Sequence, residues 1–236
     1  MIQERSKCEI QMIEELEVKQ KNKYTKDDKQ WLRLQLKDYS AINKCHIMTT
    51  RFNNETLEEN KKYRESLSKV KCIYCCPDAI ARAIPYESTL FVLEMNNSEN
   101  KIVGIGKIKN NPKLQKYVVY NENNYNRYQY IGKQRIDRNE MDEEEEEIMQ
   151  LFDNWCFKGM GHMKRGQGIK SFPLDKLYFH SRFVNIHKTV KQMFKRRTNT
   201  NTNTNTNTNT NTNTNTNTNT NTNDEKESSE ENPKMK

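Results

Sequence analysis

The chain has 236 residues, a formal net charge of +8 and a hydrophobic content of 33%. No stretch approaches the roughly 18 consecutive apolar residues of a membrane-spanning helix, and the first residues lack the apolar segment of a signal peptide. The sequence therefore predicts a protein of the cytoplasm or nucleus, neither secreted nor bound to a membrane. Its six cysteines are scattered, which favours reduced thiols over a disulfide framework.

Charge is distributed very unevenly. Residues 1–100 are nearly balanced, but residues 101–138 carry nine basic and two acidic side chains, and residues 158–197 carry eleven and one. Residues 139–157 between them carry eight acidic side chains and no basic one. A basic surface attracts RNA, DNA or anionic lipid, although the same charges could form an ordinary solvated surface.

The first 69 residues read as a helical N-terminal segment. Ile10, Ile13, Leu16 and Val18 are spaced for an amphipathic helix over 8–20. Thr25 and Asp28 have the spacing of a capping box that opens a second helix through Tyr39. Asn54 is suited to cap a third helix.

Residues 70–138 read mainly as strands. Pro77 suits the first turn of a short helix over 78–83, which must end before Pro85. The segment 96–100 is a hairpin loop. The predicted strands are 70–74, 89–95, 102–108, 117–120 and 127–131.

The C-terminal third is predicted to be helical, with a tail. Asn139 is placed to cap an acidic helix with Ile148, Leu151, Phe152 and Trp155 on its apolar side, and the carboxylates of 142–147 are expected to face water. A last helical region follows Pro173. From Thr198 to Asn223 threonine and asparagine alternate strictly, so residues 198–236 are predicted to be a disordered tail.

A strand, a short helix and a hairpin ending in Ile-Val-Gly-Ile-Gly (102–106) resemble the opening of PUA-like barrels, the group that includes ASCH, EVE and YTH domains. Residues 72–194 also resemble an uncharacterised family of nucleocytoplasmic large DNA viruses, which would place the protein in a host cell. The stretches that carry this resemblance are Cys-Ile-Tyr-Cys-Cys-Pro (72–77), Phe-Val-Leu-Glu-Met-Asn-Asn (91–97), the same Ile-Val-Gly-Ile-Gly (102–106), Tyr-Asn-Arg-Tyr (125–128), Gly-Lys-Gln-Arg-Ile (132–136) and Lys-Arg-Gly-Gln-Gly-Ile (164–169). The fold expected is α+β: a small PUA-like mixed barrel over 70–197 with helices at both ends.

Two motifs are incomplete. Gly104-Ile-Gly106 has Lys109 where a dinucleotide fingerprint needs its third glycine, so these glycines are expected to allow a bend or close contact in a strand. Cys72 and Cys75 are half of a zinc site, whose other ligands would have to come from Cys45-His46 or from Cys156 with His162. Small buried thiols are the favoured interpretation, and we expect no metal and no cofactor.

All seven glycines lie between Gly104 and Gly168, and two runs there are candidate sites. The loop 157–169 places His162, Lys164 and Arg165 among four glycines, where backbone N–H groups and fixed charges could meet a phosphate. The run 117–130 supplies tyrosines that could stack on bases. We expect both runs to meet at one mouth of the barrel, with Tyr128 and Tyr130 as stacking residues and Arg127, Arg135 and His162 as donors.

The function predicted from the sequence is binding of nucleic acid, single-stranded RNA before DNA. The alternatives are an enzyme on nucleotides or nucleic acid, with His162 as acid or base, and a non-catalytic interaction or virion protein that uses its acidic and terminal helices as contact surfaces. The sequence identifies no catalytic residues and no protein partner.

Overall fold

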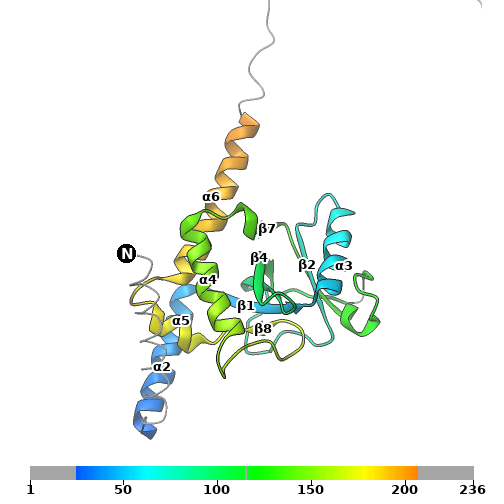
Figure 1. Cartoon of the computed structure of the whole chain (residues 1–236). Coiled ribbons are helices and arrows are strands. Elements are labelled where there is room, and N and C mark those ends of the chain that lie inside the picture. Colours follow the sequence, from blue (N-terminus) through cyan, green and yellow to red (C-terminus); the bar gives the residue numbers. More distant parts are fainter. Residues whose placement is uncertain (1–24, 115, 207–236) are drawn as a thin grey trace, which may run out of the picture. The chain divides into compact units, whose positions relative to one another are not determined.

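The computed structural model describes residues 25–114 and 116–206, with side chains described as far as Thr198. The chain separates into two units, residues 1–198 and 199–236, and the fold below is that of the first. It is a mixed α+β fold with two sheets, seen in Figure 1.

The larger sheet has five strands in the order β7-β4-β3-β1-β8. Strands β1 and β3 run parallel, and all other neighbours in this sheet are antiparallel. Both parallel strands therefore end at the same edge. The bounds are β1 Cys45–Phe52, β3 Thr89–Asn96, β4 Lys101–Lys109, β7 Gln134–Asp137 and β8 Lys170–Ser171.

The smaller sheet is antiparallel, in the order β2-β6-β5. Its strands are β2 Cys72–Cys76, β5 Lys113–Leu114 and β6 Tyr128–Gly132. Within the described residues the two sheets remain separate, so the closed barrel expected from the sequence is not formed.

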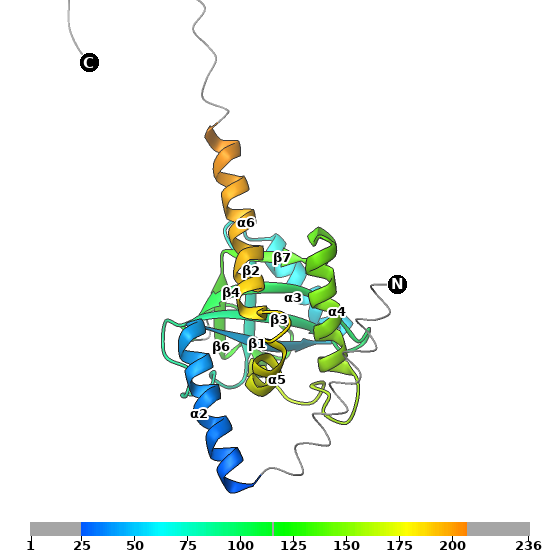
Figure 2. The same cartoon turned by 90° about the vertical axis from the view of Figure 1, so that its left-hand side faces the viewer.

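Helices cover the larger sheet on one face, while the smaller sheet and helix α3 lie on the other (Figures 1 and 2). None of the helices described is both long and apolar enough to cross a membrane. Their bounds are α2 Lys26–Asn43, α3 Asn54–Glu65, α4 Glu143–Phe157, α5 Leu174–His180 and α6 Ile186–Thr206, with short 3₁₀ turns η1 Asn123–Asn126 and η2 Arg138–Glu140.

Strand β3 divides the core because its side chains alternate between the two faces of the sheet. Phe91, Leu93 and Met95 pack against α4, α5 and α6. Leu90 and Val92 pack against the smaller sheet. Both faces of the central strands are therefore buried, which accounts for a run of apolar residues without polar alternation.

A buried polar cluster lies between the sheets. Tyr74 donates its hydroxyl proton to Glu94 Oε1 at 2.8 Å, and Arg135 donates three hydrogen bonds to the same carboxylate at 2.7–3.1 Å. Glycine is required opposite this cluster, since a Cβ atom on Gly106 would lie 1.9 Å from the Tyr74 hydroxyl oxygen. The prediction that a strand glycine allows a close approach is confirmed.

Several predicted elements are confirmed. The capping box of Thr25 and Asp28 forms, with both reciprocal hydrogen bonds, and opens α2. The hairpin is present as β3 and β4, and β6 corresponds to the strand predicted at 127–131. Helix α4 buries Ile148, Phe152 and Trp155 as its pattern predicted.

Other predictions were wrong. The segment 45–52, placed within a helical region, is strand β1. Residues 78–83 are irregular and end in a turn at 82–83 rather than forming a helix, and residues 117–120 form no strand. The caps of α3 and α4 are Asn53 and Asp142 rather than Asn54 and Asn139.

The acidic run 142–147 does not simply face water. Glu145 is fully buried and accepts hydrogen bonds from Arg197 at 2.7 and 2.8 Å, and Glu146 pairs with Arg138 at 2.7 Å. These contacts neutralise part of the basic charge that the sequence assigned to a polyanion surface.

The two ends of the chain lie partly outside the described residues. Helix α6 continues to Thr206, so the predicted disordered tail begins with a helical stretch. The predictions for residues 8–20 and for 207–236 fall outside the described residues.

Candidate functional site

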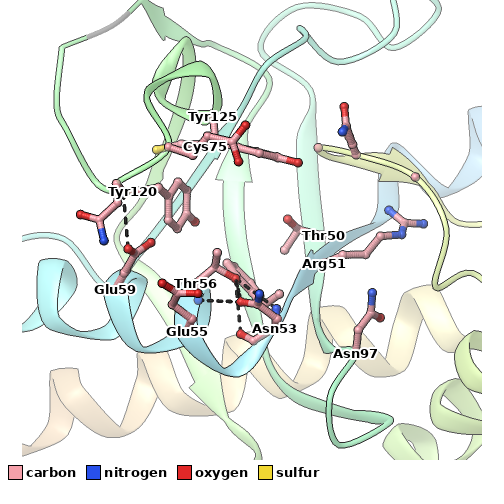
Figure 3. A pocket seen from close by; sticks show the side chains of 16 residues that line it. Thr50, Arg51, Asn53, Glu55, Thr56, Glu59, Cys75, Asn97, Tyr120 and Tyr125 are labelled. Atoms are coloured by element: carbon pink, nitrogen blue, oxygen red, sulfur yellow. Dashed lines mark hydrogen bonds between the residues drawn. The ribbon is translucent and has the colours of Figure 1, made fainter.

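A pocket of about 430 Å³ opens where the parallel strands β1 and β3 end (Figure 3). Figure 3 shows Arg51 and Asn97 at one side, Tyr120 and Glu59 at the other, and the start of α3 below. Five separate parts of the chain contribute to its lining: residues within 50–59, Cys75, Asn97, residues within 120–125, and residues 166–168.

The floor of the pocket follows from how the chain leaves β1. Asn53 caps α3 by accepting a hydrogen bond from the Thr56 N–H at 2.8 Å, while the Thr56 hydroxyl accepts one from the Asn53 N–H at 3.1 Å. The chain turns sharply into the helix, which places Glu55 and Glu59 one turn apart on the same side. Both carboxylates therefore border the pocket.

Tyrosines form the aromatic wall. Tyr120 is buried, its hydroxyl accepts a hydrogen bond from Asn60 Nδ2 at 2.9 Å, and burial raises its pKa well above the usual value. Asn126 holds the backbone of this segment by accepting from the Tyr120 N–H at 3.0 Å. Tyr125, on the 3₁₀ turn η1, is only partly buried, so its ring is the aromatic surface accessible to a ligand.

The glycine-rich loop, residues 157–169, is held by side chains at the ends of β1 and β3. Arg51 Nε donates to the Met163 carbonyl at 2.6 Å, and Asn97 Nδ2 donates to the Lys164 carbonyl at 3.1 Å. Gly168 has φ +67°, and a Cβ atom there would lie 2.9 Å from Cys76 Cβ. A side chain at this position would meet both backbone strain and a clash, so glycine allows the loop to pass close over β2.

Two polar atoms at this wall lack partners among the described residues. Arg51 Nη1 is a buried donor and Asn97 Oδ1 a buried acceptor, and neither makes a hydrogen bond. Burial lowers the pKa of Arg51, as expected for a cation held away from water without a carboxylate. Unpaired buried groups of this kind are uncommon, and the adjacent unfilled space is the pocket.

The pocket is more acidic than basic. Glu55, Glu59 and Glu122 line it, against the single cation Arg51. Such a cavity suits a ligand that presents N–H donors, since an ionised carboxylate only accepts hydrogen bonds. It does not suit a phosphate group.

Two of the residues predicted for the site are structural. Tyr130 is completely buried and its hydroxyl accepts a hydrogen bond from the Ile80 N–H at 3.0 Å. Arg135 is held by Glu94 and by Asp137 at 2.9 Å. A ring inside the core cannot stack on a base, and a guanidinium enclosed by two carboxylates has little left to donate, so both assignments are corrected.

The other predicted residues lie at the surface but outside the pocket lining. Tyr128 is partly buried, with the Arg127 guanidinium 5.5 Å from the centre of its ring. Lys164 donates to Asn100 Oδ1 at 2.7 Å, and Arg165 is exposed on the loop. His162 is partly buried, and its Nδ1 atom has no hydrogen-bond partner among the described residues.

The two runs singled out by the sequence do meet, but through other residues than those predicted. Tyr125 comes from the first run, and Gly166, Gln167 and Gly168 from the second. The strand residue Arg51 and the helix-capping Asn53 were missed because β1 had been read as helix. The Asn53-x-x-Thr56 pattern, which is a capping box, was the available signal.

The cysteines provide no metal site in the described part of the chain. Cys45, Cys72, Cys75, Cys76 and Cys156 are free and buried. Burial raises the pKa of Cys72 to about 12 and that of Cys76 to about 11. No group of three or more histidine, cysteine or acidic side chains there is arranged to hold a metal ion.

Known proteins add no further information about this site. No protein-family model matches the chain, and neither a curated protein nor a solved structure matches it significantly.

Proposed function

We propose that the protein binds nucleic acid, single-stranded RNA before DNA, by taking one base into the pocket at the ends of β1 and β3. The observation that carries the proposal is the lining: an accessible tyrosine ring, carboxylate acceptors and unpaired Arg51 and Asn97 atoms around a cavity of about 430 Å³. A nucleobase is flat and presents donors and acceptors along one edge, so it matches this set.

The acidic lining predicts which bases enter. Glu55 and Glu59 can accept hydrogen bonds from the exocyclic amino groups of adenine, cytosine or guanine, which uracil and thymine lack. Arg51 can donate to a ring nitrogen or carbonyl oxygen of the same base. We therefore expect oligomers of amino-bearing bases to bind more tightly than oligouridine.

Phosphates would be held outside the pocket. The candidate contacts are Lys164 and the exposed Arg165 on the glycine-rich loop, and Lys170 on β8. Base contacts and phosphate contacts therefore lie on different residues, whereas the sequence analysis expected them in one cluster. Changing both Lys164 and Arg165 to alanine should weaken binding to every oligomer and reduce its salt dependence, because these contacts are not base-specific.

The deciding experiment compares Tyr125→Ala with Tyr128→Ala in fluorescence-anisotropy titrations of a labelled short oligoadenylate. Loss of one stacked base costs about 1–3 kcal/mol, so Tyr125→Ala should bind roughly 5- to 150-fold more weakly. Tyr128→Ala is the matched control, since its ring does not line the pocket, and it should bind like the wild type. Equal losses in both variants, or none in either, would refute the assignment.

Glu59→Gln tests the base preference separately. Its effect should appear as a smaller ratio between oligoadenylate and oligouridine affinities, with circular dichroism showing unchanged folding. A uniform change for both oligomers would mean that Glu59 does not read the base. The same titrations with the matching DNA oligomers test the preference for RNA, which requires a contact to the 2′-hydroxyl.

We also propose that the fold is a variant of PUA-like domains. The antiparallel pair β3–β4 carries Ile102-Val-Gly-Ile-Gly106 as expected, and β6 lies close to β4, where Gly132 approaches the Lys107 carbonyl. An experimental structure in which hydrogen bonds between β4 and β6 join the two sheets would support this proposal, and one in which β6 lies away from β4 would contradict it.

A further inference from the structure

The second flank of helix α3 carries a groove of about 270 Å³ that the base pocket does not include. Residues of α3, the β3–β4 hairpin and the β7–η2 segment line it. Its charged side chains are the cations Lys61, Arg64, Lys101, Arg135 and Arg138 and the carboxylates Glu99 and Asp137.

Two of these cations are already committed to carboxylates. Arg135 pairs with Glu94 and Asp137, and Arg138 pairs with Glu146 at 2.7 Å and with Asp153 at 2.6 Å. Neither guanidinium is free to recruit a ligand, because each is held by two carboxylates.

Three cations are left for a ligand. Lys61 and Lys101 are exposed and form no hydrogen bond or ion pair within the described part of the chain. Arg64 makes one long hydrogen bond, from Nη1 to the Lys71 carbonyl at 3.4 Å, and its buried Nε has no partner among the described residues. Among the described acidic side chains that line the groove, only Glu99 is outside an ion pair, so three unpaired cations stand against one unpaired carboxylate.

The geometry of α3 connects this groove to the base pocket. Glu55 and Glu59 lie on one side of the helix, whereas Lys61 and Arg64 fall on the opposite side at 100° per residue. One helix therefore presents acceptors to the pocket and cations to the groove, separated by roughly its diameter of 10–12 Å. At ~3.4 Å for each stacked nucleotide, three or four nucleotides cover that distance.

We propose that this groove binds backbone phosphates of the nucleic-acid strand whose base occupies the pocket. The inference rests on the proposed function. The distribution of charge supports this assignment. The groove has cations outside any ion pair, which attract a phosphate, whereas the pocket has carboxylates, which would repel one.

The test uses the full chain and two labelled oligoadenylates, one of about two nucleotides and one of about six. Lys61→Gln/Lys101→Gln removes two exposed cations that form no hydrogen bond or ion pair in the described part of the chain. This variant should bind the short oligomer like the wild type and should lose most of the additional affinity of the long one. Lys62→Gln/Lys69→Gln makes the same change of charge at exposed lysines outside both sites, and should keep wild-type binding.

Salt dependence gives the magnitude. Each single-strand phosphate contact contributes about 0.7 to the log–log slope, so losing two lowers it by about 1.4. Between about 50 and about 200 mM salt, the wild type should then lose about sevenfold more affinity for the long oligomer than the variant does. A long oligomer with a neutral methylphosphonate backbone should bind the wild type and the variant equally.

The outcomes separate the two proposals. If the wild type binds both oligomers and Lys61→Gln/Lys101→Gln keeps its affinity and slope for the long one, the groove is overturned while the base pocket stands. If the wild type binds neither oligomer, the proposed function fails and the groove fails with it. Arg64→Gln provides a second measurement of the same affinity and salt slope for the long oligomer. The variant is compared with the wild type at a temperature where circular dichroism shows that both are folded.

Discussion

Removing the Arg135 guanidinium should greatly lower the free energy of unfolding, although the sequence places this residue among surface cations. Glu94 is 1% exposed and the Arg135 side chain 11%. Arg135→Met keeps an unbranched apolar side chain but deletes three hydrogen bonds to Glu94 and the pair with Asp137. The buried carboxylate then retains Tyr74 as its partner.

The magnitude follows from that uncompensated charge. Breaking a buried ion pair by removing one partner costs about 3–5 kcal/mol. With an m value of about 2 kcal/mol/M for urea, the midpoint of unfolding should fall by about 2 M, measured by circular dichroism at pH 7. Replacing both partners, as Glu94→Leu with Arg135→Met, should recover most of the loss because no charge is left buried.

An exposed pair is the matched control. Lys62 and Glu58 lie 3.8 Å apart with both side chains more than half exposed, so Lys62→Met should cost less than about 1 kcal/mol. An Arg135→Met variant that loses no more than this control would refute the structural role. If such a stable variant also failed to bind RNA, the result would support the original assignment of Arg135 to the binding site.

Three further results are expected. Burial lowers the pKa of His187 to about 4, whereas its value in the unfolded chain is about 6.5. The free energy of unfolding should therefore be highest above about pH 6.5 and should fall by roughly 3 kcal/mol as the pH drops to about 4. His187→Phe should flatten this pH dependence in urea titrations. Gly168→Ala should destabilise the protein more than Gly159→Ala, because both have positive φ but only a Cβ on Gly168 meets another residue within 4 Å; equal melting temperatures would contradict the packing described. Ending the chain at Thr206 should leave the melting temperature and RNA affinity unchanged, because the alternating threonines and asparagines offer no apolar side chain to pack, and a large drop would show that the tail contributes to the fold.

The sequence by itself determined the elements whose signals are local. The capping box at Thr25, the β3–β4 hairpin around its Asn-rich loop and the apolar side of α4 each depend on residues a few positions apart. Their physical causes, satisfied N–H groups at a helix start and a periodic apolar surface, act within one or two turns.

Tertiary structure alone decided which of those residues could act. Strand β1 is buried on both faces, so it lacks the alternation that marks a strand, and Arg51 at its end went unnoticed. Tyr130 and Tyr125 have the same chemistry, yet one is enclosed between the sheets and the other borders the pocket. Arg135 and Lys61 carry the same charge, but a carboxylate from a distant strand neutralises only the first. Burial and pairing are set by contacts between segments far apart in the chain, and no local pattern encodes them.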